Sequence, residues 1–600
     1  MAKIRMIALP IICSGMVLPM TSCSSTGKIV FANYESYFST DLISKYQSDV
    51  TFLYYQTDGD IRAKFRRSYD IAIPTTAEAL RYIHDGWVTR IDWSAFGTIA
   101  QETYPDGYYG EDDAQPYLQC INADQELQSI TSGYEAEYLL AGYDTGFSEF
   151  AEETINIDVL NDAYHITREI DKYAYDNGFF PEEYLEEVGD EYSILDFIIP
   201  YFFQDYLFIY KGEELENPFG EEEPWTWGAI NEKVGKGDEH DPRFDGRRNN
   251  KILANDDMRT NFDIGKIIQW ENEGMNPSTF SINPAPNEET INDFKGIYEE
   301  FLGAYKDTNQ FLLNSDSGQL VGTFSDYVNT SNGMYAYNGD ALLASIGNGQ
   351  ADNEEYWSNQ WYDFAKNNSV EDAPMSIIVP EYNLVAIDTT VINKNSVKLN
   401  IDGTANLDDE KTRSIYEFVY STMLDHTDYS SDVGVASDNG ETGASPTIVG
   451  SDELWYDDPN QIWAWDDEEE MYVYDVMNNF DWVMYISPWA KIDQYIWGYQ
   501  YGKVTTGGDL YEYEPIDCGA DYFWETVSGM FTDYIEGFDP DEDDDLCEAW
   551  ATMMGEAYKI LIGNTYFDEE AKAINAIEVP LSDLQKSNMY ESYIRVKNTL

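Results

Sequence analysis

The sequence predicts an α/β protein that folds as more than one lobe. Its 600 residues exceed what a single hydrophobic core normally holds, so at least two domains or lobes are expected. Apolar residues make up 43% of the chain, which is enough to build such cores and argues against global disorder. Residues 27–96 alternate between strand-like and helix-like segments, an order typical of a parallel sheet with helices on both faces.

Three strands are expected in this region. Each is a short apolar run bounded by polar residues: 28–33 (KIVFAN), 50–56 (VTFLYYQ) and 69–74 (YDIAIP). The third is apolar throughout its middle, as a strand buried on both faces would be. A helix is expected at 39–47, with Ser39 or Thr40 as its cap. Another helix, at 75–86, starts at a pair of threonines and stops at Gly86.

The first strand ends in aromatic residues around a carboxylate. The run NYESYF, residues 33–38, places Tyr34 and Tyr37 on either side of Glu35. Sheets of this kind bind ligands outside the carboxyl ends of their strands, where 33–38 and 74–77 both lie. An ammonium group that leaves water needs a carboxylate partner, and a ring within about 6 Å adds on the order of 0.5–2 kcal/mol of cation–π attraction. The pattern therefore predicts a site for a cationic amine.

The chain is strongly acidic, with a formal net charge of −77. Such a charge repels nucleic acid and anionic lipid headgroups, so nucleic acid is excluded as a partner. It attracts cations. Most surface carboxylates are interpreted as contributing to solubility or to adaptation to salt, and only those that line a cleft are candidates for function.

The chain begins like a lipoprotein precursor. Lys3 and Arg5 precede an apolar run that ends in small residues before Cys23. The run is short and interrupted by two prolines, so a secretory signal peptide at 1–22 is expected rather than a transmembrane helix. Cys23 then becomes the lipidated first residue, although Met20 stands where a leucine is usual. An ordinary export signal is the alternative interpretation.

Neither a metal site nor a cofactor site is predicted. The cysteines that follow Cys23 number three, too few for a disulfide framework, and the sequence leaves a bridge between Cys518 and Cys547 open. The four histidines fall in no zinc motif. The acidic run 539–545, DPDEDDD, lacks the glycine and the terminal glutamate of a calcium loop and is interpreted as a solvated loop.

The segment 69–96, YDIAIPTTAEALRYIHDGWVTRIDWSAF, resembles the periplasmic polyamine-binding proteins, which are the spermidine/putrescine receptors of ABC transporters. Further segments resemble the same family in the same order, and together they cover the larger part of the chain. They are 30–46 (VFANYESYFSTDLISKY), 198–215 (IIPYFFQDYLFIYKGEEL), 223–230 (EPWTWGAI), 253–262 (LANDDMRTNF), 312–344 (LLNSDSGQLVGTFSDYVNTSNGMYAYNGDALLA) and 382–393 (YNLVAIDTTVIN).

The resemblance implies a two-lobed periplasmic-binding-protein-like fold of type II, in which each lobe is a mixed sheet flanked by helices. Lobe 1 is expected at 23–205 and 385–487, and lobe 2 at 206–384 and 488–600. Acidic stretches that depart from the family pattern are interpreted as surface insertions. They lie near 98–190, 428–478 and 505–550.

The resemblance also implies where a ligand would be held. Family members sandwich the methylene chain of a polyamine between aromatic rings and hold its ammonium groups with carboxylates. Carried over position by position, these contacts fall on Tyr34, Tyr37, Asp257, Tyr337, Asp388 and Tyr485. Asp388 takes the place of the principal amine-binding aspartate. Packing remains the simpler interpretation of any single tyrosine among the 48, and a cap or turn role is the alternative for Asp257 and Asp388.

Three positions depart from the family pattern. An aromatic residue, a glutamate and a tryptophan are usual where this chain has Ala77, Thr260 and Ala386, so the exact amine is left open. Glu35 is a candidate replacement carboxylate, and Thr75, at the end of the third strand, completes the set of candidate ligand-binding residues.

The function expected from these features is that of a solute-binding lipoprotein, not an enzyme. It would capture a polyamine between its lobes and deliver it to an ABC permease, anchored by Cys23 to the outer face of the cell membrane or in the periplasm. One alternative is the same fold binding another cationic metabolite or a sugar. Others are a secreted glycoside hydrolase, for which no acid and nucleophile pair stands out, and an adhesin-like lipoprotein.

Overall fold

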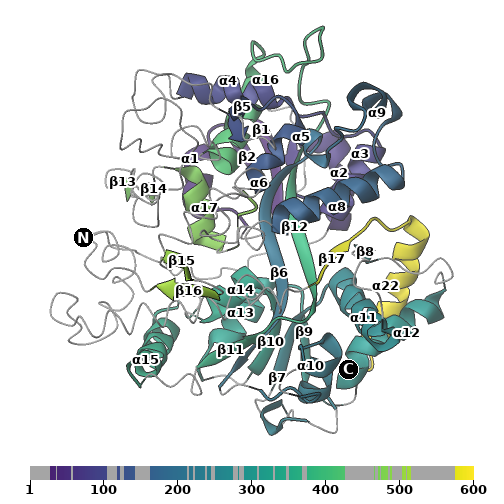
Figure 1. The fold of residues 1–600 in the computed structure, drawn as a ribbon, viewed down its shortest axis with the longest axis vertical. Helices are drawn as coiled ribbons and strands as arrows, with labels where there is room; N and C mark the ends of the chain where they lie inside the picture. The colour runs from purple at the N-terminus through teal and green to yellow at the C-terminus, as the bar shows by residue number, and fades with distance from the viewer. Residues whose placement is uncertain are drawn as a thin grey trace.

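The computed structural model shows a mixed α/β protein with two lobes joined by two long strands (Figure 1). It describes residues 28–34, 37–55, 58–103, 118–121, 127–141, 162–212, 215–220, 223–236, 240–244, 251–274, 281–282, 290–306, 308, 310–328, 331–345, 347, 350–367, 374–425, 465–466, 471–472, 474–483, 485, 487–489, 503–507, 510–514 and 574–600. Cys23, the predicted signal peptide, Glu35, Cys518 and Cys547 lie outside these ranges.

Within the described residues, eleven strands form one sheet that passes through both lobes. Two of them, β6 (Ile199–Lys211) and β12 (Tyr382–Ile392), pair antiparallel and run from one lobe into the other (Figure 1). All but the last of the 13 residues of β6 are buried. A nearly unbroken apolar run of this length is what a strand covered on both faces requires.

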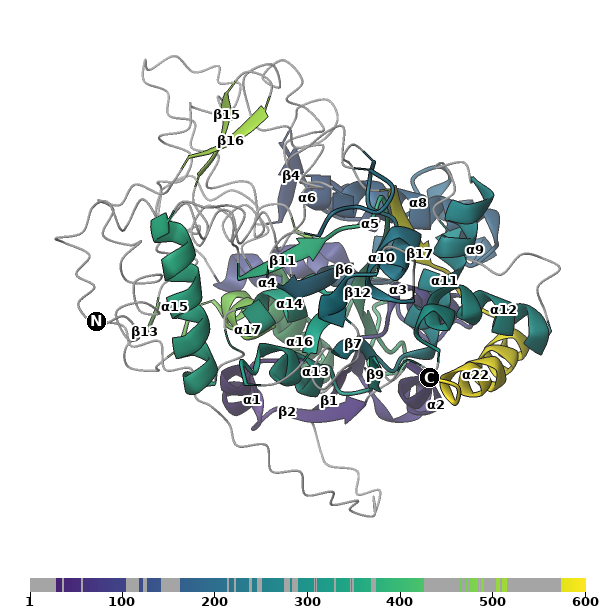
Figure 2. The ribbon, with the colours of Figure 1, turned by 90° about the horizontal axis from the view of Figure 1, so that it is seen from below.

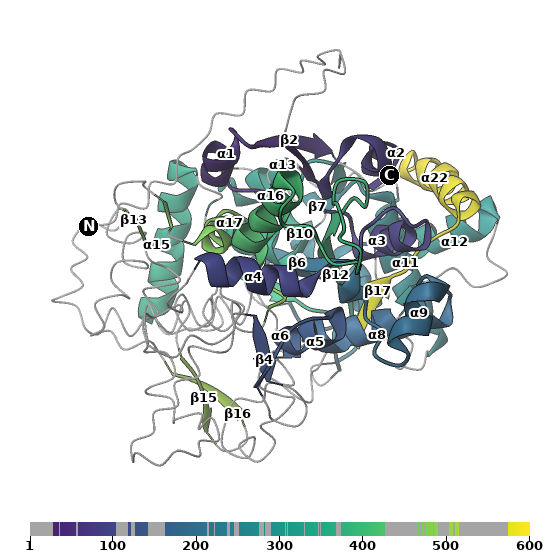
Figure 3. The same cartoon turned by 90° about the horizontal axis from the view of Figure 1, so that it is seen from above.

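The first lobe is built on three parallel strands. β1 (Ile29–Tyr34) pairs with β2 (Val50–Tyr55) on one side and with β3 (Ile71–Ala72) on the other, and β3 pairs antiparallel with the end of β12. The helices of this lobe include α1 (Thr40–Tyr46), α2 (Asp58–Ser68), α3 (Thr76–His84), α4 (Trp93–Thr103), α16 (Glu410–Val419), its π-helical continuation η5 (Tyr420–Leu424) and α17 (Asp475–Val483). Figure 3 shows α4 and α16 side by side above β6 and β12.

The second lobe repeats this order. β7 (Lys251–Asn255) lies between β9 (Phe311–Asn314) and β10 (Ser331–Tyr337), all parallel, and β10 pairs antiparallel with the far half of β6. Its helices are α10 (Trp227–Val234), α11 (Met258–Glu273), α12 (Ile291–Leu302), η3 (Gly303–Tyr305), α13 (Ser317–Ser325), α14 (Asn338–Ser345), α15 (Ala351–Asn367) and α22 (Asp583–Lys597). α15 and α22 lie at opposite sides of this lobe (Figures 1 and 2).

Across the sheet, the strands of the first lobe lie in the order β2, β1, β3, and those of the second lobe in the order β9, β7, β10. In each lobe the next strand is one that begins in the other lobe, β12 for the first and β6 for the second. This is the topology of type II periplasmic solute-binding proteins, so the predicted fold class is confirmed. Among the remaining described elements, three strands extend the large sheet, six form three separate two-stranded sheets, and the others are helices. They are β4 (Gln119–Ile121), β5 (Leu127–Ser129), α5 (Gly133–Ala136), α6 (Tyr138–Ala141), α8 (Asp162–Asp176), α9 (Glu182–Val188), η1 (Ile194–Asp196), η2 (Pro242–Phe244), β8 (Ser281–Ile282), β11 (Met375–Ile378), β13 (Trp465–Asp466), β14 (Met471–Tyr472), β15 (Lys503–Gly507), β16 (Leu510–Glu514) and β17 (Ile574–Glu578).

Local signals explain the first helices. Ser39 caps α1 by accepting the backbone N–H of Asp41 at 3.2 Å, and Thr75 caps α3. Gly86, just beyond α3, has a φ of +63°, a conformation that glycine adopts without strain. The sequence did not indicate α2, which is polar except for a short stripe; its Ile61 becomes fully buried.

In the part of the chain that the structure describes, buried side chains form two hydrophobic clusters, and β6 contributes to both. Leu207 and Ile209 belong to the larger cluster, which fills the first lobe and continues under α13 and α14. Tyr206 and Phe208 belong to the smaller cluster, which packs the sheet of the second lobe against α10, α11, α12 and α22. Successive side chains of a strand point to opposite faces, so this single strand anchors both cores.

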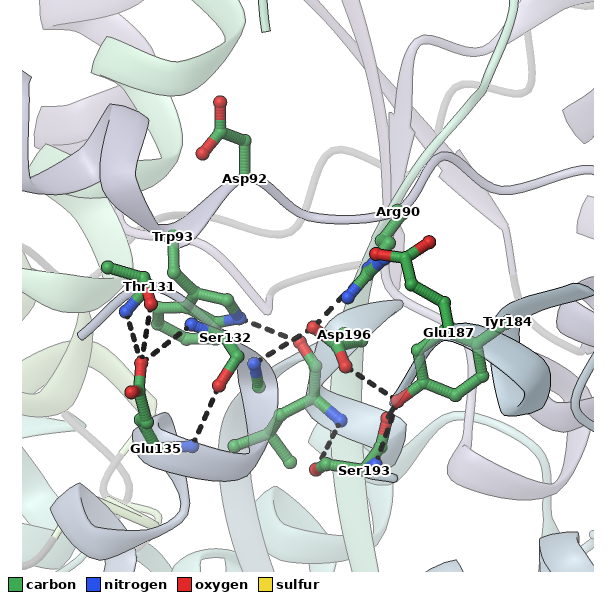
Figure 4. A network of polar contacts seen from close by, with 12 residues as sticks. Arg90, Asp92, Trp93, Thr131, Ser132, Glu135, Tyr184, Glu187, Ser193 and Asp196 are labelled. Carbon is green, nitrogen blue, oxygen red and sulfur yellow. Dashed lines mark hydrogen bonds and ion pairs between the residues drawn. The ribbon is translucent and has the colours of Figure 1, made fainter. Parts of the chain in front are cut away.

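Part of the first predicted insertion is built into the first lobe. Asp196, which is 1% exposed, accepts the backbone N–H of Gly133 at 2.9 Å and the hydroxyl of Tyr184 at 2.6 Å (Figure 4). Arg90 lies 3.7 Å from the same carboxylate and 2.8 Å from Glu187. A Cβ at Gly133 would lie 2.2 Å from the backbone nitrogen of Asp196, so only glycine fits there. Within the second predicted insertion, residues 475–478 form the start of α17.

The contact between α11 and α12 depends on a glycine, and this gives a test of the packing. A Cβ at Gly265 would lie 2.2 Å from the carbonyl oxygen of Ile297, whereas a Cβ at Gly296 would meet open space. We expect Gly265→Ala to lower the unfolding free energy by roughly 2–4 kcal/mol, because overpacking forces the helices apart. The control Gly296→Ala should be neutral or stabilising by up to about 1 kcal/mol. Urea unfolding measures both, and equal stabilities would contradict the close helix contact.

Candidate binding site at the crossover strands

Asp388 lies on β12 where the sheets of the two lobes meet. Its backbone forms an isolated bridge with Thr75, the N-cap of α3, and the pairing of β12 with β6 shifts register between Asp388 and Thr389. Thr389 consequently faces Pro200 rather than Tyr201. A proline has no N–H to give to a strand ladder, so an irregularity at this point is expected, and such bulges re-aim the side chains beside them.

The Asp388 side chain is 5% exposed and is enclosed by groups from the first lobe and from β6. Its carboxylate accepts hydrogen bonds from the hydroxyl of Tyr37 and from the amide of Gln204. The Gln204 amide also donates to the Tyr37 hydroxyl oxygen. Carboxylate, amide and phenol thus form one buried polar cluster.

Aromatic rings surround this cluster. The centroid of the Tyr37 ring lies 5.3 Å from that of Phe202, 5.4 Å from that of Tyr485, 5.7 Å from that of Tyr34 and 6.0 Å from that of Tyr201. Most of these pairs meet edge to face, which places positive ring edges against negative faces. The result is a wall of rings beside the Asp388 carboxylate, whereas Glu35, the carboxylate that the sequence places between Tyr34 and Tyr37, lies outside the described residues.

The loop that carries Tyr37 is fixed by α17. Asn479 of α17 accepts the backbone N–H of Ser39 at 2.8 Å and donates to the hydroxyl of Tyr201. Tyr201 in turn donates to the carbonyl of Tyr37 at 3.3 Å, and Asn33 donates to the same carbonyl at 3.2 Å. These bonds hold the loop from three elements, so the Tyr37 ring is pre-positioned.

Burial and the charge of Asp388 keep the nearby phenols protonated. Desolvation, followed by the negative charge of Asp388, raises the pKa of Tyr37 well above its usual value. Desolvation and then the charges of Asp340 and Asp388 raise the pKa of Tyr485 in the same way. Both hydroxyls therefore remain hydrogen-bond donors at physiological pH.

Tyr485 connects this cluster to the second lobe. Its ring lies against Gly339, where a Cβ would come within 1.9 Å of a ring carbon, so a larger residue there would displace the ring. Its hydroxyl is hydrogen-bonded to Asp340, at the start of α14. Desolvation raises the pKa of Asp340 to about 7. Asp340 was not predicted from the sequence, since nothing in the local run YNGDA marks it.

The predicted residues of the second lobe form their own group. Asp257 is the N-cap of α11 and accepts the backbone N–H groups of Arg259 and Thr260, both at 2.8 Å. Asp257 therefore has the helix-capping role that the sequence analysis gave as the alternative to ligand binding. Tyr337 packs edge to face on Tyr206, with centroids 4.8 Å apart, and is hydrogen-bonded to the Thr260 side chain. Burial, followed by the charge of Glu578, which the sequence did not single out, raises the pKa of Tyr337 well above its usual value.

The structure thus brings Tyr34, Tyr37, Thr75, Asp388 and Tyr485 together, and places Asp257 and Tyr337 beyond Tyr485 on the second lobe. The hydroxyl of Thr75 accepts the backbone N–H of Glu78 in its capping role at 3.4 Å. Across the described ranges, no group of acidic, histidine or cysteine side chains has the arrangement of a metal site. In the same ranges, no helix is both long and apolar enough to cross a bilayer.

Comparison with known proteins assigns the chain to a family. The model of a family described as hypothetical lipoprotein (MG045 family) matches residues 2–113 and 182–600. The chain belongs to this family. The match leaves out 114–181, inside the first predicted insertion, and runs through the other two. None of the curated proteins matches the chain.

Solved structures with a similar arrangement include solute-binding proteins. One, from Listeria monocytogenes and named for a spermidine/putrescine ABC transporter, is 10% identical, with 95% of this lipoprotein and 99% of that chain covered and a TM-score of 0.39. The spermidine/putrescine substrate-binding protein of Streptococcus pneumoniae is 12% identical, with 89% and 100% covered and a TM-score of 0.34. A Treponema pallidum lipoprotein is 12% identical, with 66% and 81% covered and a TM-score of 0.32.

The raised pKa of Asp340 makes the stability of this lipoprotein depend on pH. An unfolded aspartate loses its proton near pH 4, whereas the folded state keeps the Asp340 proton to about pH 7. The folded state binds the extra proton between these values, so the contribution of Asp340 to stability falls as the pH rises through this window.

Asp340→Asn removes this titration. We expect the variant to gain unfolding free energy relative to the parent by up to about 1.4 kcal/mol per pH unit between about pH 4 and 7, and no more above it. Urea unfolding at several pH values measures the difference. Asp190→Asn, at an exposed turn, is the control. Parallel curves for Asp340→Asn and its parent would show that the carboxyl does not titrate in this window.

Proposed function

We propose that this chain is a solute-binding lipoprotein that captures a polyamine, spermidine or putrescine, between its two lobes. The observation that carries the proposal is the buried Asp388 carboxylate, enclosed by tyrosine rings at the point where both crossover strands meet. A group this buried and charged is costly unless it meets hydrogen-bond donors or a cation.

The chemistry of this cluster suits an ammonium group. A primary ammonium carries three N–H donors and a positive charge, and it would add a charge-assisted hydrogen bond to those that Asp388 accepts from Tyr37 and Gln204. Ring faces attract the same charge, and a methylene chain packs well against them. Tyr37 and Tyr485 offer both kinds of surface at one site.

A second group of carboxylates lies toward the other lobe and suits the far end of a linear amine. Asp340 is hydrogen-bonded to Tyr485, and Asp257 and Glu578 lie around Tyr337. A ligand with a cationic group at each end would touch both lobes. Only a ligand that contacts both lobes favours their closure over their opening.

The partners follow from the family and from this site. Lipidation at Cys23 would anchor the protein at the outer face of the membrane, where it would hand its ligand to an ABC permease. Another cationic metabolite would use the same carboxylates. A sugar is the second candidate ligand, because Gln204 and the tyrosine hydroxyls are uncharged donors of the kind that sugars use.

Asp388→Asn tests the proposal, because it keeps the shape of the side chain and removes its charge. We expect the affinity for spermidine, measured by calorimetry, to fall by roughly 2–3 kcal/mol, as when a charge-assisted bond is lost in a buried site. Putrescine and an oligosaccharide are titrated in parallel, and tight binding of the sugar alone would replace the amine by the second candidate.

Asp205→Asn is the matched control. Asp205 is also a buried carboxylate on the crossover strands, 4% exposed, and it accepts the amide of Asn383 at 2.7 Å. Its replacement should change stability and leave spermidine affinity within about threefold, or 0.7 kcal/mol. Equal loss in both variants would mean that Asp388 acts through the fold and not through the ligand.

A further inference from the structure

The C-terminal helix α22 belongs to the core of the second lobe. Its Met589 and Tyr593 lie in the smaller hydrophobic cluster, packed against α11 and α12. The Ser592 hydroxyl donates to the carbonyl of Ile291, at the start of α12, at 2.7 Å. Motions of the second lobe therefore carry α22 with them.

The first turn of α22 contacts the first lobe. Lys586 Nζ lies 2.7 Å from Glu78 of α3. Asp583 lies 2.8 Å from Arg81 of α3 and 3.2 Å from Arg62 of α2. Figure 3 shows α22 beside α2. The side chains of α2 and α3 that face inward belong to the larger cluster, so every one of these ion pairs joins one lobe to the other.

Glu78 is the centre of the arrangement. Its side chain is 3% exposed and meets cations from both lobes, with Arg62 at 3.4 Å and Arg81 at 4.0 Å in addition to Lys586. A carboxylate this buried loses much of its hydration and depends on its partners. In a chain with 35 basic residues against 112 acidic ones, three of the basic side chains gather on this one carboxylate.

We propose that the first turn of α22 is an ion-pair latch, formed by Asp583 and Lys586 with Arg62, Glu78 and Arg81, that holds the two lobes in the arrangement seen here. Opening about β6 and β12 would take Lys586 from Glu78 and Asp583 from its two arginines. Salt weakens such pairs most where they are exposed, so ionic strength would bias the lobes toward opening.

The latch and the candidate binding site share one helix. α3 begins after Thr75, whose backbone bridges to Asp388, and Glu78 lies in the first turn of the same helix. The latch needs no ligand, however, so it can hold or fail independently of the proposed polyamine function. In the absence of ligand it would set how often the site opens.

A matched pair of lysines on α22 tests the latch. Lys586 and Lys597 have nearly equal exposure, 36% and 34%, and each contacts a carboxylate. The partner of Lys597 is Asp256, within the second lobe, so this ion pair does not cross between lobes. Lys586→Met removes a bond across the lobes, and Lys597→Met removes a bond within one.

The distance between the lobes is measured on the full chain, without ligand, by electron–electron double resonance between two spin labels. One label replaces Lys64 of α2 and the other replaces Lys306, which follows η3; both positions are exposed. The labels are attached to a genetically encoded unnatural amino acid, so the cysteines are not modified. We expect Lys586→Met to raise the population of the longer distance by about 3- to 10-fold, and Lys597→Met to leave it unchanged. Salt between about 0.05 M and 0.5 M should shift the parent in the same direction, and it should shift Lys586→Met less, because that variant keeps only the pairs of Asp583.

Two further variants keep the test decisive. Asp583→Asn, which changes an exposed side chain, should also raise the population of the longer distance. It replaces Lys586→Met in the test if that variant does not unfold cooperatively. Lys586→Arg should restore the parent distribution. Identical distributions for Lys586→Met and Lys597→Met, or a parent distribution that does not respond to salt, would overturn the latch whatever ligand the protein binds.

Discussion

The antiparallel pairing of β6 with β12 is the interaction on which both lobes depend. β12 completes the sheet of the first lobe and β6 that of the second, although each strand begins in the opposite lobe. Neither sheet is whole until residues near 200 have met residues near 388. Such distant pairing costs chain entropy before it contributes stability, so the two cores are expected to consolidate together and slowly.

The same pairing explains why a buried carboxylate is tolerated at Asp388. Pro200 interrupts the ladder, and the register shift beside it gives the strand a local conformation that the rest of β12 lacks. The carboxylate accepts hydrogen bonds from Tyr37 and Gln204 at this point. An apolar residue at this position would make the protein more stable. A charged residue at such a buried position is therefore the usual sign of a functional site, where stability has been given up for activity.

Much of the fold could be predicted from the sequence, because strands and capped helices leave local patterns. β1, α1, β2 and α3 lie where periodicity and caps placed them, and the two-lobed topology agrees with the ordered resemblance. α2 was missed because, among its residues whose burial is described, 61–68, only Ile61 and Phe65 are buried. Gln204 and Asp340 were missed for another reason: they reach the site through long-range packing that no local pattern records.

The hydrogen bond between Gly133 and Asp196 makes the first lobe depend on a residue outside the match to the family. Residues 114–181 fall outside the match to the family, yet Gly133 supplies a donor to a carboxylate that lies within the matched part. Losing that segment now would leave Asp196 buried with one donor fewer, at a cost of about 1–3 kcal/mol. Removal of residues 114–181 would therefore require a compensating change at Asp196 to keep the stability of the first lobe.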